Sequence, residues 1–171
     1  MEPIHRFPSH FALHGGPKFT PDGRFVYFAS RDGWITKFDL YSLQVVSEIR
    51  AGINTRNLAI SADGKYVMVA NMLPHTLVAL NGDDLSLLEV IPALDKSGHK
   101  SSRVSAVYQA APRKSFIVAL KDVAEVWEVF YGEDAPPVYS GLVHSHEEGM
   151  VEGLSQKGPF PIRRIEVTRP L

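Results

Sequence analysis

Short runs of alternating apolar and polar residues follow one another along most of the chain, with turn residues between them. Two of these runs, residues 20–29 (TPDGRFVYFA) and 61–70 (SADGKYVMVA), have the same pattern of side chains. In both, Asp-Gly supplies the left-handed conformation that a tight hairpin turn needs, and the aromatic and β-branched residues after it favour a buried strand. The pattern predicts antiparallel strands joined by hairpins.

The spacing of the two runs indicates a repeat. Asp63 follows Asp22 by 41 positions, which is the length of one blade of a β-propeller. Each copy continues with a strand, an Asp- or Asn-rich turn and another strand, over residues 33–49 and 75–91. A third copy, over residues 103–130, keeps the strand pattern but has Pro112-Arg113 in place of Asp-Gly, and we expect its outermost strand at residues 138–143.

The predicted fold class is therefore all-β, a partial propeller whose blades have four antiparallel strands. We expect three blades in residues 1–143, a flexible acidic and Gly-rich loop in residues 144–158, and the start of a further blade in residues 159–171. Closed propellers have about four to eight blades, and an open stack leaves two sheet edges unpaired. We therefore expect either a second chain that completes the propeller or a chain that is a piece of something longer.

Composition narrows the classes of function. The formal net charge is -1, which gives no electrostatic bias toward polyanions, so we expect no nucleic-acid partner. The absence of cysteine excludes disulfides, thiolate catalysis, Cys-ligated zinc and the attachment of a covalent c-type haem. Nowhere do about 18 apolar residues run together, so we expect no membrane span. The first residues do not have the pattern of a signal peptide.

Few motifs carry recognisable chemistry. The Walker, G-x-S-x-G and H-E-x-x-H motifs do not occur. Residues 144–148 (HSHEE) have side chains of the types that hold zinc, or they form a solvated acidic loop. His75, in the turn between two strands of the second copy, is either close to a ligand or an exposed loop residue. The most unusual motif is His14-Gly15-Gly16, because two glycines weaken a strand.

The order of several short motifs resembles the cytochrome d1 domain family. These motifs are Leu13-His14, Arg31-Asp-Gly, Phe38-Asp-Leu, Thr55-Arg56, and Arg103-Val followed by residues 116–121 (FIVALK). The resemblance covers residues 11–130 and is closest to the dehydrogenase and haem d1 biosynthesis branch, with nitrite reductase as the third branch. It implies an eight-bladed propeller that binds haem d1, a periplasmic location and a function in denitrification.

The resemblance also implies roles for five residues. His14 corresponds to the proximal ligand of the haem iron, and it is therefore the predicted metal ligand; a neutral imidazole suits iron. Haem d1 carries several carboxylates, which arginine grips with two hydrogen bonds. Arg31, Arg56 and Arg103 are therefore predicted cofactor-binding residues, and Lys18 falls near another basic position. The alternatives are a half-buried, hydrogen-bonded His14 beside a glycine kink, and solvated basic residues in turns.

Two classes of function follow. In the first, the chain is a haem d1-binding propeller that handles the tetrapyrrole or transfers electrons, with a c-type cytochrome or a second chain as its partner. We assign no catalytic residue and expect the isolated chain to be inactive, because it has no c-type haem. In the second class, the chain is a non-catalytic propeller fragment that serves as a protein-interaction scaffold, since a fold does not fix a function. A scaffold has no need of His14 with Arg31 and Arg56, so this set favours the first class.

Overall fold

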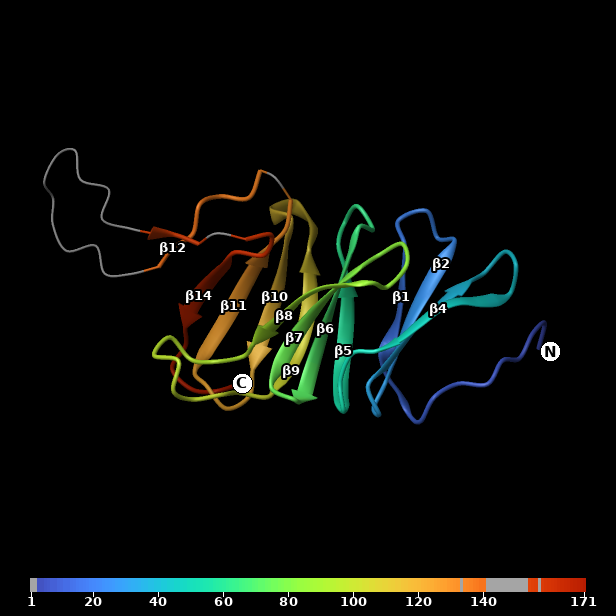
Figure 1. Ribbon diagram of the computed structural model, residues 1–171, viewed down its shortest axis with the longest axis horizontal. Coiled ribbons are helices and arrows are strands. Elements are labelled where there is room, and N and C mark those ends of the chain that lie inside the picture. The colour runs from blue at the N-terminus through green and yellow to red at the C-terminus, as the bar shows by residue number, and fades with distance from the viewer. Residues whose placement is uncertain (1–2, 133, 141–153, 157) are drawn as a thin grey trace, which may run out of the picture.

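The computed structural model describes residues 3–132, 134–140, 154–156 and 158–171, and in them three four-stranded antiparallel sheets stand in a row (Figure 1). The prediction of all-β propeller blades with four antiparallel strands is confirmed. In chain order the strands of the sheets are β1 (Leu13–Phe19), β2 (Phe25–Ser30), β3 (Trp34–Asp39) and β4 (Gln44–Arg50), then β5 (Asn54–Ile60), β6 (Tyr66–Leu73), β7 (Thr76–Asn81) and β8 (Leu87–Pro92), then β9 (Val104–Ala110), β10 (Ser115–Leu120), β11 (Glu125–Phe130) and β14 (Ile162–Glu166).

The turn that joins the first and second strands has the same hydrogen bond in the first two sheets. In the turn between β1 and β2, the Thr20 hydroxyl accepts a hydrogen bond from the N–H of Phe25 at 3.0 Å. In the turn between β5 and β6, the Ser61 hydroxyl accepts one from the N–H of Tyr66 at 2.9 Å. The third sheet instead has a 3₁₀ turn, η1 (Ala111–Arg113), at this place. The repeat in the sequence is therefore a repeat of local hydrogen bonds, which the third copy replaces.

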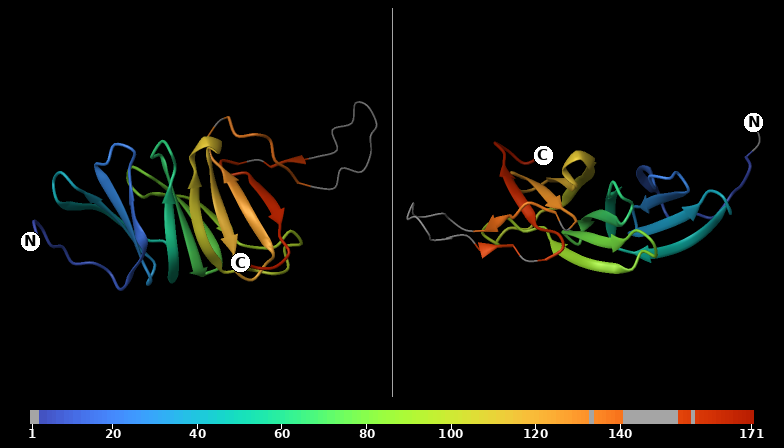
Figure 2. Two further views of the ribbon diagram at one scale, coloured as in Figure 1. Left: turned by 180° about the vertical axis from the view of Figure 1, so that it is seen from behind. Right: turned by 90° about the horizontal axis from the view of Figure 1, so that it is seen from above.

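The sheets pack face to face, and the first strands of neighbouring sheets lie next to each other. β5 lies next to β1 on one side and next to β9 on the other. Apolar side chains fill the space between the first and second sheets around Tyr27 and Val69, and the space between the second and third sheets around Met68 and Trp127. Figure 2 shows from above that the described part of the chain forms an open row of sheets.

A buried amide joins the inner strands of the second and third sheets. Asn57 on β5 is 6% exposed. Its Nδ2 donates to the carbonyl oxygen of Val107 on β9 at 2.9 Å, and its Oδ1 accepts from the N–H of Val107 at 3.0 Å. Because one backbone residue satisfies the amide on both sides, the pair fixes the offset between the two strands. It also fixes the position of Arg56, the preceding residue on β5.

The outermost strand of the third sheet is not where the sequence pattern placed it. β14 pairs with β11 along residues 125–129, so the tail, which we expected to begin a further blade, supplies the fourth strand of the third sheet. Tyr139 and Ser140, from the expected outermost strand, form β12 (Tyr139–Ser140) and pair with β13 (Leu154–Ser155) in a separate two-stranded sheet. The rest of that expected strand beyond residue 140 lies outside the described residues.

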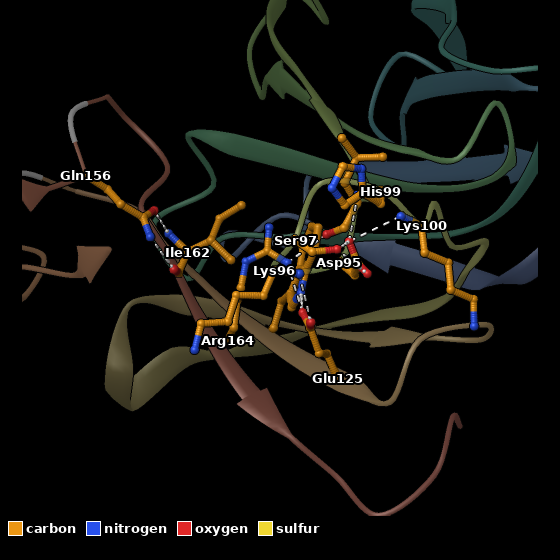
Figure 3. Close-up of polar contacts among 11 residues, drawn as sticks. Asp95, Lys96, Ser97, His99, Lys100, Glu125, Gln156, Ile162 and Arg164 are labelled. Atoms are coloured by element: carbon orange, nitrogen blue, oxygen red, sulfur yellow. Dashed lines mark hydrogen bonds and ion pairs between the residues drawn. The ribbon is translucent and has the colours of Figure 1, made fainter. Parts of the chain in front are cut away.

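Polar contacts explain why β14 takes this place (Figure 3). Arg164 Nη1 donates to Glu125 Oε2 at 2.9 Å and to the carbonyl oxygen of Leu94 at 2.7 Å. Gln156 exchanges two hydrogen bonds with the backbone of Ile162, at 2.8 Å and 2.7 Å. The side chain of Glu125 is 8% exposed, and a buried carboxylate needs charged or hydrogen-bonding partners. The third sheet therefore favours an outer strand that carries an arginine at this register.

Candidate functional site

One residue of the second sheet holds the imidazole of His14 at both ring nitrogens. His14 lies near the start of β1, and its partner Arg56 lies on β5. Nη1 of Arg56 is 2.9 Å from Nε2 of His14, and the carbonyl oxygen of Arg56 is 2.9 Å from Nδ1. A guanidinium only donates, so Nε2 accepts and the ring proton lies on Nδ1, which donates to the carbonyl. In this tautomer Nε2 carries the lone pair with which an imidazole binds a metal.

Gly15 permits this contact between the two strands. Its φ is +83°, and a Cβ at this position would lie 2.6 Å from the Cβ of Asn57 and 3.3 Å from the carbonyl oxygen of Arg56. Gly16 has a φ of +67°, but a Cβ there would have nothing within 4 Å. Both positions need a left-handed backbone, and only Gly15 also needs the absence of a side chain. The two glycines after His14 therefore let β1 approach the Arg56 backbone closely.

A hollow of about 320 Å³ opens beside Arg56. Its lining is made of Arg31, Asn54, Thr55, Arg56, Met72, Ser105 and Lys121. Three of these residues are cations and none is a carboxylate, so the hollow favours anions. Arg31 and Lys121 are exposed and Arg56 is half-buried. The structure thus places Arg31 and Arg56 in the lining of one hollow and His14 next to Arg56; that these residues bind a cofactor stays a prediction.

Lys121 is the cation of this hollow that sequence reasoning missed. Arg31, Met72 and Lys121 occupy equivalent places, where the second strand of each sheet reaches the turn to the third strand. The signal in the sequence is the pair Arg31-Asp32 in the first copy, which recurs as Lys121-Asp122 in the third. The third copy has no Asp-Gly turn to anchor its alignment, which hid this equivalence.

Arg103 forms an ion pair with a carboxylate of its own sheet. Its Nε and Nη2 donate to the two oxygens of Asp122 at 2.9 Å and 2.6 Å, and its backbone N–H donates to Asp122 at 2.9 Å. These hydrogen bonds hold the pKa of the Asp122 carboxyl well below its usual range. The pair fastens the start of β9 to the turn that carries Lys121. Arg103 is not among the residues that line the hollow, and its contact with a cofactor stays a prediction.

Two other candidates, Lys18 and His75, are not among the residues that line the hollow. Lys18 lines a different recess of the surface, and Nδ1 of His75 is 2.8 Å from the Ser101 hydroxyl. The zinc-type side chains at residues 144–148 fall outside the described residues. In the part of the chain that the structure describes, no three His, Asp or Glu side chains gather as they would around a metal ion. That part also contains no helix of the length and apolarity needed to cross a membrane.

Comparison with known proteins points to one family. The family model described as "Cytochrome D1 heme domain" matches residues 1–145. The dihydro-heme d1 dehydrogenase of Pseudomonas aeruginosa is 66% identical over 136 residues, which make up 80% of this chain and 27% of that protein. Protein NirF of the same organism is 32% identical over 125 residues, which make up 72% of this chain and 32% of NirF.

A solved structure has the same fold over nearly the whole chain. It is described as "Dihydro-heme d1 dehydrogenase NirN in complex with DHE", and it matches with a TM-score of 0.81 and 54% sequence identity. The match covers 98% of this chain and 31% of that one. The chain therefore spans a third or less of the length of each of these proteins.

Proposed function

The chain belongs to the cytochrome D1 heme domain family, and on that premise we propose that it binds a d1-type haem with the imidazole of His14 as an axial ligand of the iron. The state of His14 carries the proposal: its ring proton lies on Nδ1 and its Nε2 is the acceptor. Metal-binding histidines have their other ring nitrogen hydrogen-bonded to a carbonyl or carboxylate, which fixes the tautomer and the ring orientation. The carbonyl oxygen of Arg56 supplies that bond to His14.

The hollow suits the carboxylate side groups that the family resemblance implies for the ligand. Arg31, Arg56 and Lys121 line it together, with no acidic side chain among them. A guanidinium binds a carboxylate through two parallel hydrogen bonds, whereas an ammonium acts as a point charge. In the proposal Arg31 and Arg56 grip carboxylates and Lys121 adds positive charge. Arg103 supports the cluster through Asp122.

The proposed place of the chain is the haem d1 maturation or denitrification system of the periplasm. A bound d1-type haem supplies the redox chemistry, and the protein contributes binding, orientation and charge. The residues of this chain orient the tetrapyrrole by an imidazole on one strand and by cations at the ends of the neighbouring strands. A c-type cytochrome or a second chain that completes the propeller is the proposed protein partner.

The test is an absorption titration of the purified chain with haem d1, beside His14→Ala and Arg31→Met. We expect a saturable shift of the ligation type in the wild-type protein, its loss in His14→Ala, and weaker binding with the same spectrum in Arg31→Met. An identical titration in the wild-type protein and His14→Ala would refute the axial role of His14. A protein that binds no haem d1 at all would refute the proposed function and leave the interaction scaffold as the better description.

A further inference from the structure

Arg56 acts on His14 in two opposing ways. Its carbonyl oxygen orients the imidazole through Nδ1, while its guanidinium occupies Nε2, the atom that the proposed function assigns to iron. One lone pair cannot serve a hydrogen-bond donor and a metal at the same time. The guanidinium must therefore leave Nε2 before iron can bind there.

Resting on the proposed function, we infer that Arg56 is a latch on His14, closed in the ligand-free protein and released by an anionic group of the ligand in the adjoining hollow. Nη1 of Arg56 is 2.9 Å from Nε2 of His14, and Arg56 is also one of the residues that line the hollow. A carboxylate offers the guanidinium two charge-assisted hydrogen bonds, whereas the neutral imidazole nitrogen offers one. Binding of the carboxylate therefore draws the guanidinium away from Nε2.

The latch makes Arg56 a specificity-determining residue. A ligand with a carboxylate at the right distance from its metal opens Nε2 and binds it in one event. A metal ion or metal complex without an anionic group meets a covered Nε2, because it gives the guanidinium no better partner. The close approach of β1 to β5 at Gly15 keeps the latch within reach, since it holds the imidazole against the Arg56 backbone.

Arg31 provides the matched control. It lines the same hollow as Arg56 and is also an arginine. Within the described part of the chain, its side chain has no hydrogen bond to His14. Arg56→Met removes a cation from the hollow and the donor from Nε2, while the backbone carbonyl that orients the imidazole stays. Arg31→Met removes a cation from the hollow and leaves the latch intact.

The first test is the reactivity of His14 toward diethyl pyrocarbonate in the ligand-free protein. The reagent needs an unprotonated imidazole nitrogen with a free lone pair. The chain has 7 histidines, and peptide mass spectrometry distinguishes modification of His14 from modification of the others. We expect Arg56→Met to react about tenfold faster at His14 than the wild-type protein, the factor for one lost hydrogen bond to a charged group. Arg31→Met should match the wild type. Equal rates in the wild type and Arg56→Met, or equal acceleration in both variants, would overturn the latch.

A second measurement needs no variant and so does not depend on how a variant folds. A long-range ¹H–¹⁵N correlation spectrum of the wild-type, ligand-free protein reports which ring nitrogen of His14 carries the proton. The latch requires a neutral ring with its proton on Nδ1. A ring protonated on Nε2 would overturn the inference, because that nitrogen could not accept from Arg56.

Stopped-flow mixing with haem d1 separates the latch from the proposed function. Arg56→Met should form the His14-ligated spectrum faster than the wild type and yet bind haem d1 more weakly at equilibrium. Arg31→Met should only bind more weakly. If haem d1 shifts the spectrum of none of the three proteins, the proposed function fails, while the reactivity of ligand-free His14 still decides whether Nε2 is covered. If haem d1 binds through His14 and Arg56→Met behaves as the wild type in both assays, the latch alone fails.

Discussion

Gly15→Ala should destabilise the protein much more than Gly16→Ala, although the two glycines are neighbours. Both have a positive φ, +83° and +67°, so alanine at either position pays about 1–2 kcal/mol for a left-handed backbone. At Gly15 the new methyl group would also lie 2.6 Å from the Cβ of Asn57, whereas at Gly16 it would meet nothing within 4 Å. Overpacking of this kind costs about 1–3 kcal/mol more.

The assay is urea unfolding of the wild-type protein and both variants under one set of conditions. With an m-value of about 2 kcal/mol/M, the extra cost at Gly15 corresponds to a midpoint about 0.5–1.5 M lower than that of Gly16→Ala. Gly15→Ala should also weaken haem d1 binding through His14, because β1 must move away from Arg56, while Gly16→Ala should leave that binding nearly unchanged. Equal midpoints for the two variants would refute the argument that Gly15 is required by the close approach of β1 to β5.

Two further predictions concern stability. Asn57→Ala should cost about 2–4 kcal/mol in urea unfolding, because it leaves both backbone groups of Val107 without their partner; a loss below about 0.5 kcal/mol would contradict the role given to this amide. The Arg24 guanidinium, which donates to Asp39, lowers the pKa of that carboxyl from 3.8 to about 2. The folded state thus binds fewer protons, so the stabilisation is present above about pH 4 and is lost as the pH falls toward 2. The difference in unfolding midpoint between the wild type and Asp39→Asn should shrink over that range, and a pH-independent difference would contradict it.

The sequence predicted the parts of the fold that depend on local structure. The turns at Asp22 and Asp63 use side chains only a few residues away, so their repeat could be recognised and the four-stranded blades followed from it. The comparisons confirm the family that the ordered motifs from His14 to Arg103 indicated. The outer strand of the third sheet was predicted wrongly because Arg164 meets the buried Glu125 across 39 positions. An alternating pattern does not reveal which distant strand carries the partner of a buried charge.

The residue types of the candidate site could be proposed from the sequence, whereas the contacts among these residues could not. Arg31 and Arg56 were recognised from short motifs, and they line one hollow. That Arg56 holds both nitrogens of His14 depends on the register between two sheets, which no spacing within the chain determines. Lys121 was missed because its position becomes equivalent to that of Arg31 only after β10 is aligned with β2. The ion pair between Arg103 and Asp122 likewise depends on how the strands of the third sheet are arranged, which the sequence pattern does not give.

The most direct test of the central claim is imidazole rescue of a His14→Gly variant in the absorption titration with haem d1. The removed side chain leaves room for free imidazole beside the carbonyl oxygen of Arg56. If His14 is the axial ligand, the variant loses the ligation spectrum of the wild type and regains it when imidazole is added, and Arg31→Met with its intact histidine shows no response to imidazole. A variant that keeps the wild-type spectrum without imidazole would contradict the claim that His14 ligates the iron.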